Sequence, residues 1–167
     1  DRLLKAVRFN DARIVLCLLL GWGLFSAHGR VLLSTRTYAA DMRNPYAYVH
    51  TTEDFLKMVD EVRTLALLHK LGKGSRVKIF TTSEAEHWPL PWYLRDFNRV
   101  SYFVGVPDEG YLDGEFLIVH PDLKEDLLKR LKKEYYAPSI DYSLREGIIL
   151  NLIYGQGIRD TFIKTEQ

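Results

Sequence analysis

One stretch of sixteen residues, Ile14 to Gly29, carries no formal charge and most constrains what this chain can fold into. It reads IVLCLLLGWGLFSAHG, and Arg13 and Arg30 bracket it. A straight helix of that length spans about 24 Å, which is short of the roughly 30 Å hydrocarbon core of a bilayer. The flanking arginines can extend their charged ends to the interface, and the apolar residues 31–33 prolong the run. The stretch therefore predicts a transmembrane helix over residues 14–33.

Two other interpretations of this stretch remain open. A signal peptide fits the basic residues that precede it, but Ser26 to Arg30, SAHGR, is a poor cleavage site. A buried core helix would have to be apolar on every face, which is unusual in a chain of 167 residues. Trp22 and Phe25 are typical of a membrane interface and favour the transmembrane interpretation.

Basic residues on either side of the stretch indicate an orientation. Four precede it and three follow it, so the positive-inside rule leans towards a cytoplasmic amino-terminal side and an extracytoplasmic remainder. They are Arg2, Lys5, Arg8 and Arg13 before the stretch and Arg30, Arg36 and Arg43 after it. Because the chain opens on Asp1 with no initiator Met, we expect it to be part of a longer protein.

Composition narrows the class of the remaining chain. The 23 basic and 22 acidic residues give a formal charge of +1, which argues against a nucleic-acid-binding surface. Cys17 is the only cysteine, so no internal disulfide can form. Apolar residues make up 47% of the sequence, which is enough for the core of one globular domain.

We predict three segments along the chain. Residues 1–35 hold a membrane-proximal segment and the predicted transmembrane helix, and residues 36–50 form an extended linker with a turn at Asn44-Pro45. Residues 51–167 form an extracytoplasmic α/β domain. Tyrosines 38, 46 and 48 of the linker are candidate interfacial anchors.

Residue periodicity gives the elements of the domain. Helical spacing of apolar residues predicts helices over residues 53–70 and 122–136, the first capped by Thr51 or Thr52 and the second by Asp122. Alternating or continuous apolar runs predict strands over residues 76–83, 99–106 and 115–121, and a terminal hairpin within residues 139–155. This order predicts an α/β fold, a small sandwich with a partly parallel sheet and flanking helices.

The segment from Ser83 to Phe97, SEAEHWPLPWYLRDF, concentrates aromatic, acidic and proline residues between two predicted strands. Leu90 precedes Pro91, which favours extended backbone at Leu90. Pro91 suits the first turn of a helix, so PWYLRDF predicts a short helix. Trp88-Pro89 is an aromatic–proline bond, the type most prone to be cis.

Two interpretations of this segment compete. In the structural one, Trp92, Leu94 and Phe97 pack on the sheet while Arg95 pairs with Asp96 or a neighbouring carboxylate. In the functional one, the segment follows the carboxyl end of a strand, where open α/β sheets tend to bind ligands. An exposed Trp face would suit a sugar ring and an Arg would suit a phosphate. The candidate substrate contacts are His87, Trp88, Trp92, Tyr93 and Arg95.

Other chemistries find little support. The chain has no GxGxxG, GxxxxGK[ST], GxSxG, HxH or HExxH motif, so we expect no cofactor and no metal. A metal site would require His50 or His120 to fold beside Glu84, Glu86 and His87. Glycoside hydrolysis would need two carboxylates at a suitable separation, which the sequence does not fix. Its candidates are Glu84, Glu86, Asp96 and Asp108.

Two motifs carry a resemblance to a known family. NPYAYVHTTEDFLKMVDEV, from Asn44, and EHWPLPWYLRDFNRVSYF, from Glu86, resemble the C-terminal region of polytopic membrane proteins described as flippase-activity-associated. These proteins are related to type-C glycosyltransferases of the protein mannosyltransferase kind. The likeness covers about Asn44 to Tyr154, and the tail after Gly114 fits more loosely.

The resemblance implies a parent protein with a bundle of transmembrane helices, of which residues 14–33 would be the last. Type-C enzymes hold their acidic catalytic residues in an early loop, so no catalytic residue carries over to this chain. The expected function is that of an extracytoplasmic C-terminal domain of a membrane glycosyltransferase-like protein acting on lipid-linked sugars. The alternative is a non-catalytic, membrane-anchored module that docks a flippase or another membrane partner. The expected partners are membrane lipid, lipid-linked sugar and other membrane glycosylation proteins, with no nucleic acid.

Overall fold

The structure, a computed structural model, describes residues 2–39, 44, 51–108 and 112–165, with side chains from residue 12 onward. The chain divides into two compact units, Asp1–Tyr48 and Val49–Gln167. We call them unit 1 and unit 2 and describe each by itself.

Unit 1 is a long helix, α1, which spans Arg2–Leu32 and continues through a π-helical turn, η1, at Leu33–Thr37. Its segment Ala12–Thr37 is 26 residues long with a mean hydropathy of 1.6, so it is long and apolar enough to cross a membrane. A signal sequence near the amino terminus would meet the same criteria. Within this unit none of that segment is buried, unlike the helix of a soluble core.

The helical backbone of unit 1 runs further than the sequence predicted. It begins well before Ile14 and continues to Thr37, two residues into the segment predicted as an extended linker. Most of that linker, including Tyr46 and Tyr48, lies outside the described residues.

Unit 2 opens with α2, Glu53–Leu68, close to the predicted bounds. Thr52 is the N-cap, and its side-chain oxygen accepts a hydrogen bond from the Phe55 N–H. Glu53 and Asp54 in the first turn complement the positive end of the helix dipole. One apolar stripe of α2 is buried, and it consists of Phe55, Met58, Val59, Val62, Leu65 and Ala66.

Unit 2 is built on a six-stranded mixed sheet in the order β2-β1-β3-β6-β4, with β5 also pairing with β6. The strands β1, β2 and β3 are parallel, while β3, β4 and β5 each pair antiparallel with β6. This confirms the predicted α/β class with a partly parallel sheet. The strand bounds are β1 Arg76–Thr81, β2 Arg99–Val104, β3 Phe116–Val119, β4 Tyr135–Tyr136, β5 Tyr142–Arg145 and β6 Ile148–Gly155.

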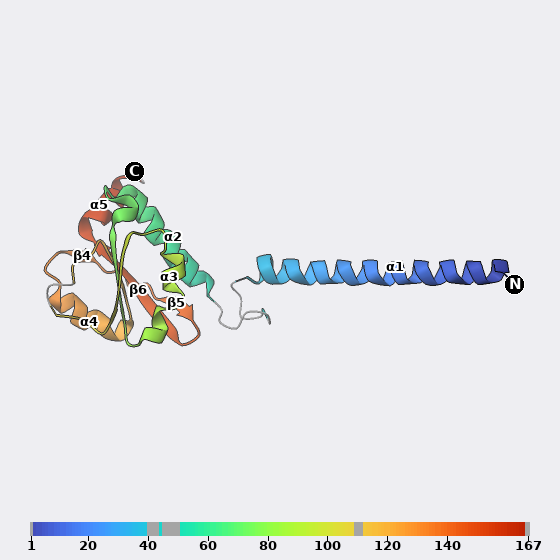
Figure 1. Ribbon diagram of the computed structural model, residues 1–167. Coiled ribbons are helices and arrows are strands. Elements are labelled where there is room, and N and C mark those ends of the chain that lie inside the picture. Colours follow the sequence, from blue (N-terminus) through green and yellow to red (C-terminus); the bar gives the residue numbers. More distant parts are fainter. Residues whose placement is uncertain (1, 40–43, 45–50, 109–111, 166–167) are drawn as a thin grey trace. The chain divides into compact units, whose positions relative to one another are not determined.

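Helices cover both faces of this sheet, with α2 and α3 on one side and α4 on the other (Figure 1). The short turns η2 and η3 precede and follow β1. The helix C-terminal to the sheet, α5, contacts α2 and β6. The bounds are η2 Gly72–Gly74, η3 Glu84–His87, α3 Leu90–Tyr93, α4 Pro121–Arg130 and α5 Gln156–Thr165.

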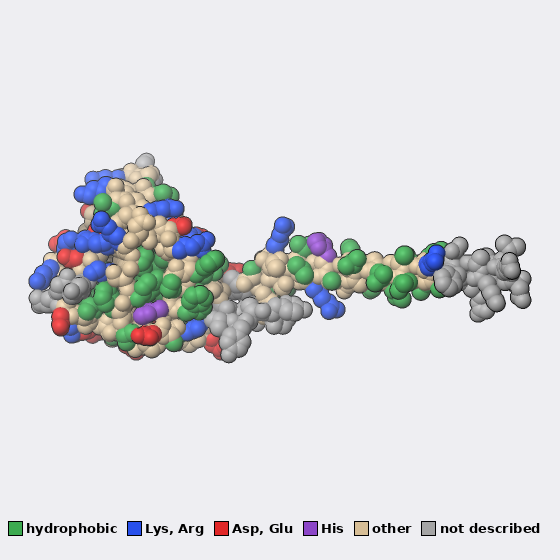
Figure 2. Space-filling view, viewed as in Figure 1, with side chains coloured by type: hydrophobic (Ala, Val, Ile, Leu, Met, Phe, Trp, Pro, Cys, Tyr) green, Lys and Arg blue, Asp and Glu red, His purple; other side chains and the backbone are tan. Residues whose placement is uncertain are grey.

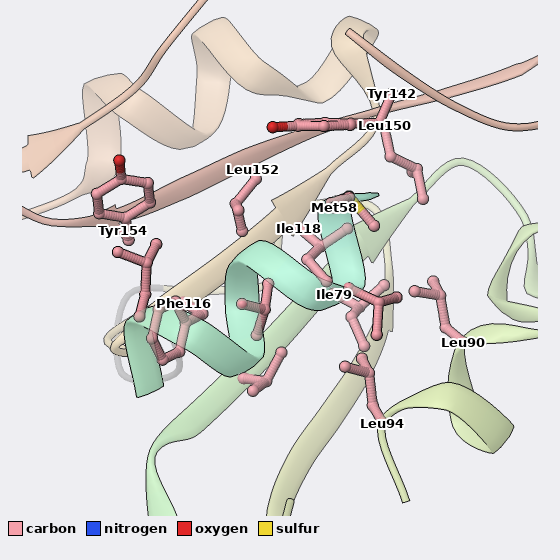
Figure 3. Packing of buried hydrophobic residues seen from close by; sticks show 14 of the residues in the cluster. Met58, Ile79, Leu90, Leu94, Phe116, Ile118, Tyr142, Leu150, Leu152 and Tyr154 are labelled. Atoms are coloured by element: carbon pink, nitrogen blue, oxygen red, sulfur yellow. The ribbon is translucent and has the colours of Figure 1, made fainter. Parts of the chain in front are cut away.

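Strand alternation divides the core into two layers. Ile79, Phe116 and Ile118 point towards α2, where they meet Met58 and other members of the larger cluster (Figure 3). The opposite side chains, among them Phe80 and Leu117, pack with Leu127 of α4. All four residues of β3 are fully buried, as predicted for a strand covered on both faces.

Three predicted element bounds were wrong. The second long helix begins at Pro121 with His120 as its N-cap, and it ends at Arg130. Tyr135 and Tyr136, expected in that helix, pair with β6, because their aromatic side chains suit a half-buried strand. Leu90, expected to be extended, is the first residue of α3. Helix α5 was not predicted.

Candidate functional site

The carboxyl ends of β1 and β2 meet at one end of unit 2, because the two strands are parallel and in register. An open groove of about 680 Å³ lies there, lined by Glu84, His87, Tyr102, Phe103, Val104 and Pro107. We call it the carboxyl-edge groove. Figure 2 shows hydrophobic side chains gathered around a His side chain on the viewed face of unit 2, while Lys and Arg gather towards the end that holds the C-terminus.

His87 is positioned by contacts to β2. Its Nε2 lies 3.5 Å from the carbonyl oxygen of Phe103, and its ring centroid lies 5.2 Å from that of Tyr102 at a tilt of 54°. Burial raises the pKa of Tyr102 to about 12, so its hydroxyl stays protonated at neutral pH. The groove therefore combines the Tyr102 ring with an imidazole and the exposed carboxylate of Glu84. The Phe103 ring lies on the opposite face of the sheet, where it stacks on Phe80.

Hydrogen bonds on two sides hold η3, the short turn that carries His87. Glu86 accepts hydrogen bonds from the backbone N–H of Thr82 at 2.9 Å and from its hydroxyl at 2.5 Å. Burial opposes ionisation of Glu86, but the hydrogen bonds from Thr82 and the nearby His120 outweigh it and lower the pKa. Arg145, at the β5–β6 turn, donates to the carbonyl oxygen of Ala85 at 2.8 Å. The β5–β6 turn and η3 lie side by side (Figure 1).

Trp92 and Arg95 form an exposed pair beyond the groove lining. The guanidinium carbon of Arg95 lies 4.3 Å from the centre of the Trp92 ring, and its Nη1 donates to the Trp92 carbonyl oxygen at 2.9 Å. Trp92 is 60% exposed. One face of the indole is thus occupied by a cation of the same chain, an arrangement that stabilises both side chains.

The structural interpretation of this segment was partly wrong. Leu94 and Phe97 are buried as expected, but Trp92 is not. The reason is helical spacing: Leu90 in α3 and Leu94 at its C-cap lie four residues apart and share one side, while Trp92, two residues from each, faces the other. Asp96 forms an ion pair with Lys73 at 3.6 Å. Arg95, expected to pair with a carboxylate, stacks on the Trp92 ring instead.

Tyr93 and Trp88 lie in environments that differ from that of Trp92 and from each other. The Tyr93 ring meets Phe55 edge-on at a centroid distance of 5.0 Å, and its carbonyl oxygen accepts from Arg63 Nη2 at 2.9 Å. Tyr93 is therefore half-buried against the core. Trp88 is 56% exposed and is joined to Pro89 by a cis peptide bond. Of the five predicted contacts, only His87 lines the carboxyl-edge groove.

Sequence reasoning missed the part of the groove that β2 and the segment after it supply, namely Tyr102, Phe103 and Val104 of β2 and Pro107 beyond it. A signal for them existed, because parallel neighbouring strands bring their carboxyl ends together. The rule points to the segment after β1, and it points equally to the carboxyl end of β2 and the segment that follows it. Within the described residues no three His, Cys, Asp or Glu side chains gather in a way that could hold a metal.

A second, smaller pocket of about 290 Å³ lies near the amino ends of the parallel strands, where His69, Glu115 and Tyr135 are among its lining residues. Glu115 accepts three hydrogen bonds from Arg76, the shortest from its backbone N–H at 2.6 Å. Burial disfavours the charged carboxylate, yet these bonds outweigh it and lower the pKa of Glu115. The Arg76–Glu115 pair fastens the start of β1 to the start of β3.

Comparisons with models of protein families, with curated proteins and with solved structures gave no match to this chain.

Proposed function

We propose that this chain is the C-terminal part of a membrane glycosyltransferase-like protein that acts on lipid-linked sugars. Unit 2 would hold the sugar head group on the extracytoplasmic side, and the reacting groups would lie elsewhere in the protein. The observation that carries the proposal is the carboxyl-edge groove, lined by the Tyr102 ring, His87 and Glu84, in a chain that also has a helix long and apolar enough to cross a membrane. The resemblance carried by the two sequence motifs supports the same function.

The lining of the groove suits a sugar better than a flat apolar ligand. A sugar ring presents C–H groups on its faces and hydroxyls around its rim. Tyr102 offers aromatic surface for the first, and Glu84 and His87 offer polar atoms for the second. The exposed Arg95 on Trp92 adds a cation outside the lining, which suits a phosphate of the lipid carrier.

The test is transfer of lipid-linked sugar by the full-length protein that carries His87→Ala, Trp92→Ala or Arg95→Ala. We expect His87→Ala to lower turnover most, because His87 lines the groove. We expect Trp92→Ala and Arg95→Ala to raise the apparent KM, because both would act on the carrier. Leu67→Ala is the matched control, since Leu67 is an exposed apolar residue of α2 outside the groove lining.

A parallel measurement is titration of unit 2 with a polyprenyl-phosphate sugar. Saturable binding that His87→Ala weakens and Leu67→Ala leaves unchanged is the expected result. If His87→Ala, Trp92→Ala and Arg95→Ala are expressed normally and all leave turnover and glycolipid binding unchanged, these residues have no substrate role.

A second function is favoured by one observation, the exposure of Trp88, Trp92 and Val104 on unit 2. Exposed aromatic and apolar side chains are common where proteins dock. In this alternative, unit 2 is a non-catalytic module that docks a flippase or another membrane partner. Binding of a membrane protein partner by unit 2, without binding of glycolipid, would favour the alternative over the first proposal.

A further inference from the structure

The two edges of the sheet in unit 2 are built differently. One edge is formed by β4 and β5, strands of two and four residues, and β5 carries a register shift between Ser143 and Arg145. The other edge is β2, six residues long, which in the described part of the chain pairs only with β1. Short strands and bulges are features that prevent an edge from pairing with another chain. The first edge has both features.

The β2 edge lacks these protective features. Its sequence RVSYFV contains no proline and no lysine, and its only charge is at its first position, Arg99. Aromatic and β-branched residues of this kind favour strand pairing. A regular apolar edge strand of this length is a template for addition of another strand.

The free backbone groups of β2 can be identified from its contacts. The Gly105 N–H donates to the carbonyl oxygen of Thr81 at 2.8 Å, so the backbone at Gly105 points towards β1. Backbone direction alternates along a strand, so the N–H and C=O groups of Val100, Tyr102 and Val104 point away from β1. These three residues present the hydrogen-bonding edge.

Charges at the two ends of β2 determine which strand direction fits. Arg99, at the amino end, is exposed. Glu84 and Asp108, also exposed, flank the carboxyl end. A second copy of β2 in antiparallel orientation would bring each Arg99 to the acidic end of the other copy. A parallel copy would place like charges together, which is unfavourable.

We propose that β2 pairs with β2 of a second copy of this chain, antiparallel, about a two-fold axis at Tyr102. Val100 then lies opposite Val104 of the other copy, and Ser101 lies opposite Phe103. Each outward-facing residue exchanges both backbone groups with the residue opposite it. Such a pairing is isologous and closes after two copies, so it gives a dimer.

This dimer would change the carboxyl-edge groove. Val104, which is 54% exposed in the single chain, becomes covered. The Arg99 of the second copy reaches the end of the groove that holds Glu84, and the groove gains a cation that a single chain does not supply from its lining. The inference rests on the geometry of β2 and does not depend on the proposed function.

The first experiment measures the mass of the full chain in detergent by light scattering over a range of concentrations. We expect a dimer for the unchanged chain. Val104→Lys should weaken dimerisation by roughly tenfold or more, because it places a charge in the strand pairing. Leu67→Lys is the matched control: it places the same charge at an apolar residue of α2 that is more exposed than Val104, and it should leave the dimer intact.

The second experiment is a charge reversal. Arg99→Glu alone should weaken the dimer, and addition of Glu84→Arg to the same chain should restore it, since each reversed charge again meets an opposite one. Loss of folding cannot produce such a rescue. A gain in the double variant over Arg99→Glu therefore supports contact between these two positions of different copies.

Two results would overturn the proposal. One is a monomer for the unchanged chain at every concentration. The other is a dimer that persists in Val104→Lys with unchanged affinity, which would locate the interface elsewhere, for instance on α1. Amide hydrogen exchange distinguishes these cases directly, because Val100, Tyr102 and Val104 should be protected in the dimer and exposed in the monomer.

Discussion

The helices α1 and α2 are both rich in apolar residues, but they present them in opposite ways. In α1 the apolar side chains from Ile14 to Leu33 are exposed around the helix, with Phe25 and Leu24 each 74% exposed. In α2 the apolar side chains form one stripe, and Phe55 at its start is fully buried. The difference lies in spacing, because an apolar stripe packs on a protein core on one side, while a surface that is apolar all round suits a membrane span or the core of a larger protein.

This comparison also separates how the two helices are stabilised. Helix α2 is held by side-chain packing and by polar contacts at its start, where Thr52 bonds to β5. The segment Ala12–Thr37 contains no Asp or Glu, and none of it is buried within unit 1. We therefore expect α2 to respond to changes in the core and α1 to respond to changes in its apolar surface.

The largest expected effect comes from Phe55→Ala in α2. It removes a fully buried ring that packs against Tyr93, and it should lower the free energy of unfolding of unit 2 by about 3–5 kcal/mol. Urea unfolding measures the change. Leu67→Ala, on the exposed side of the same helix, should stay within about 0.5 kcal/mol. Equal losses at Phe55 and Leu67 would show that the buried side of α2 contributes no more to stability than its exposed side.

A charge in the middle of α1 is the next test. Leu24→Lys should make membrane insertion less favourable by about 2.5–3.5 kcal/mol, the cost of a lysine at the centre of a spanning helix. The measurement is the fraction of chain retained in membranes after alkaline extraction. Leu33→Lys, near the end of the segment, should cost less because lysine can extend to the interface. Equal retention of Leu24→Lys and the unchanged chain would show that residue 24 does not lie at the centre of a spanning segment.

Loss of the α2 cap should have a smaller effect. Thr52→Ala removes the oxygen that accepts from the Phe55 N–H and the hydroxyl that donates to the Ser143 carbonyl oxygen. We expect a loss of about 1–2 kcal/mol in the stability of unit 2. Thr52→Ser keeps both contacts and should lose much less. If the two variants lose the same amount, the cap does not contribute.

The smallest expected effect is the pH dependence of unit 2 through Glu115. Because its pKa is lowered in the folded state, its contribution is fully present above the unfolded-state pKa and is lost as pH falls through the folded-state pKa. Stability should therefore fall on acidification below about pH 4.5, by up to about 1 kcal/mol from this partly exposed pair. Urea unfolding of Glu115→Gln across pH 3–6 should show a flatter profile. Membrane retention of α1 should not change over this range, because its apolar segment has no carboxylate.

Much of unit 2 could be predicted from the sequence because its elements have strong periodicity. The stripe of α2 and the continuous apolar run of β3 each indicate one structure only. Helix α5 could not be predicted in the same way, since Gly155 and Gly157 at its start indicate a turn and its residues are mostly polar. Tyr135 and Tyr136 were assigned to the wrong element because their pairing with β6 is a tertiary contact.

The candidate site was harder to predict than the fold. The sequence placed the aromatic-rich segment after β1, and this position at the end of a strand is where the groove lies. Helical spacing puts Leu90 and Leu94 on one side and Trp92 on the other, but the sequence could not show that α3 would turn the side with Leu90 and Leu94 towards the sheet. Nor could it show that Arg95 would stack on Trp92 when Asp96 was taken by Lys73.

The hydrogen bonds of Thr52 also determine when, during synthesis on the ribosome, unit 2 can complete its folding. Thr52 caps a helix near the start of unit 2, and the carbonyl to which its hydroxyl donates follows 91 residues later. At ~5–20 residues per second, the ribosome needs roughly 5–20 s to make that stretch. Until then α2 has neither this partner nor β6, the strand on which β3, β4 and β5 all assemble. The newly made α2 can pack on residues of β1 and β3 first, but it must wait for the last strand of its own sheet to complete the cover of its apolar stripe.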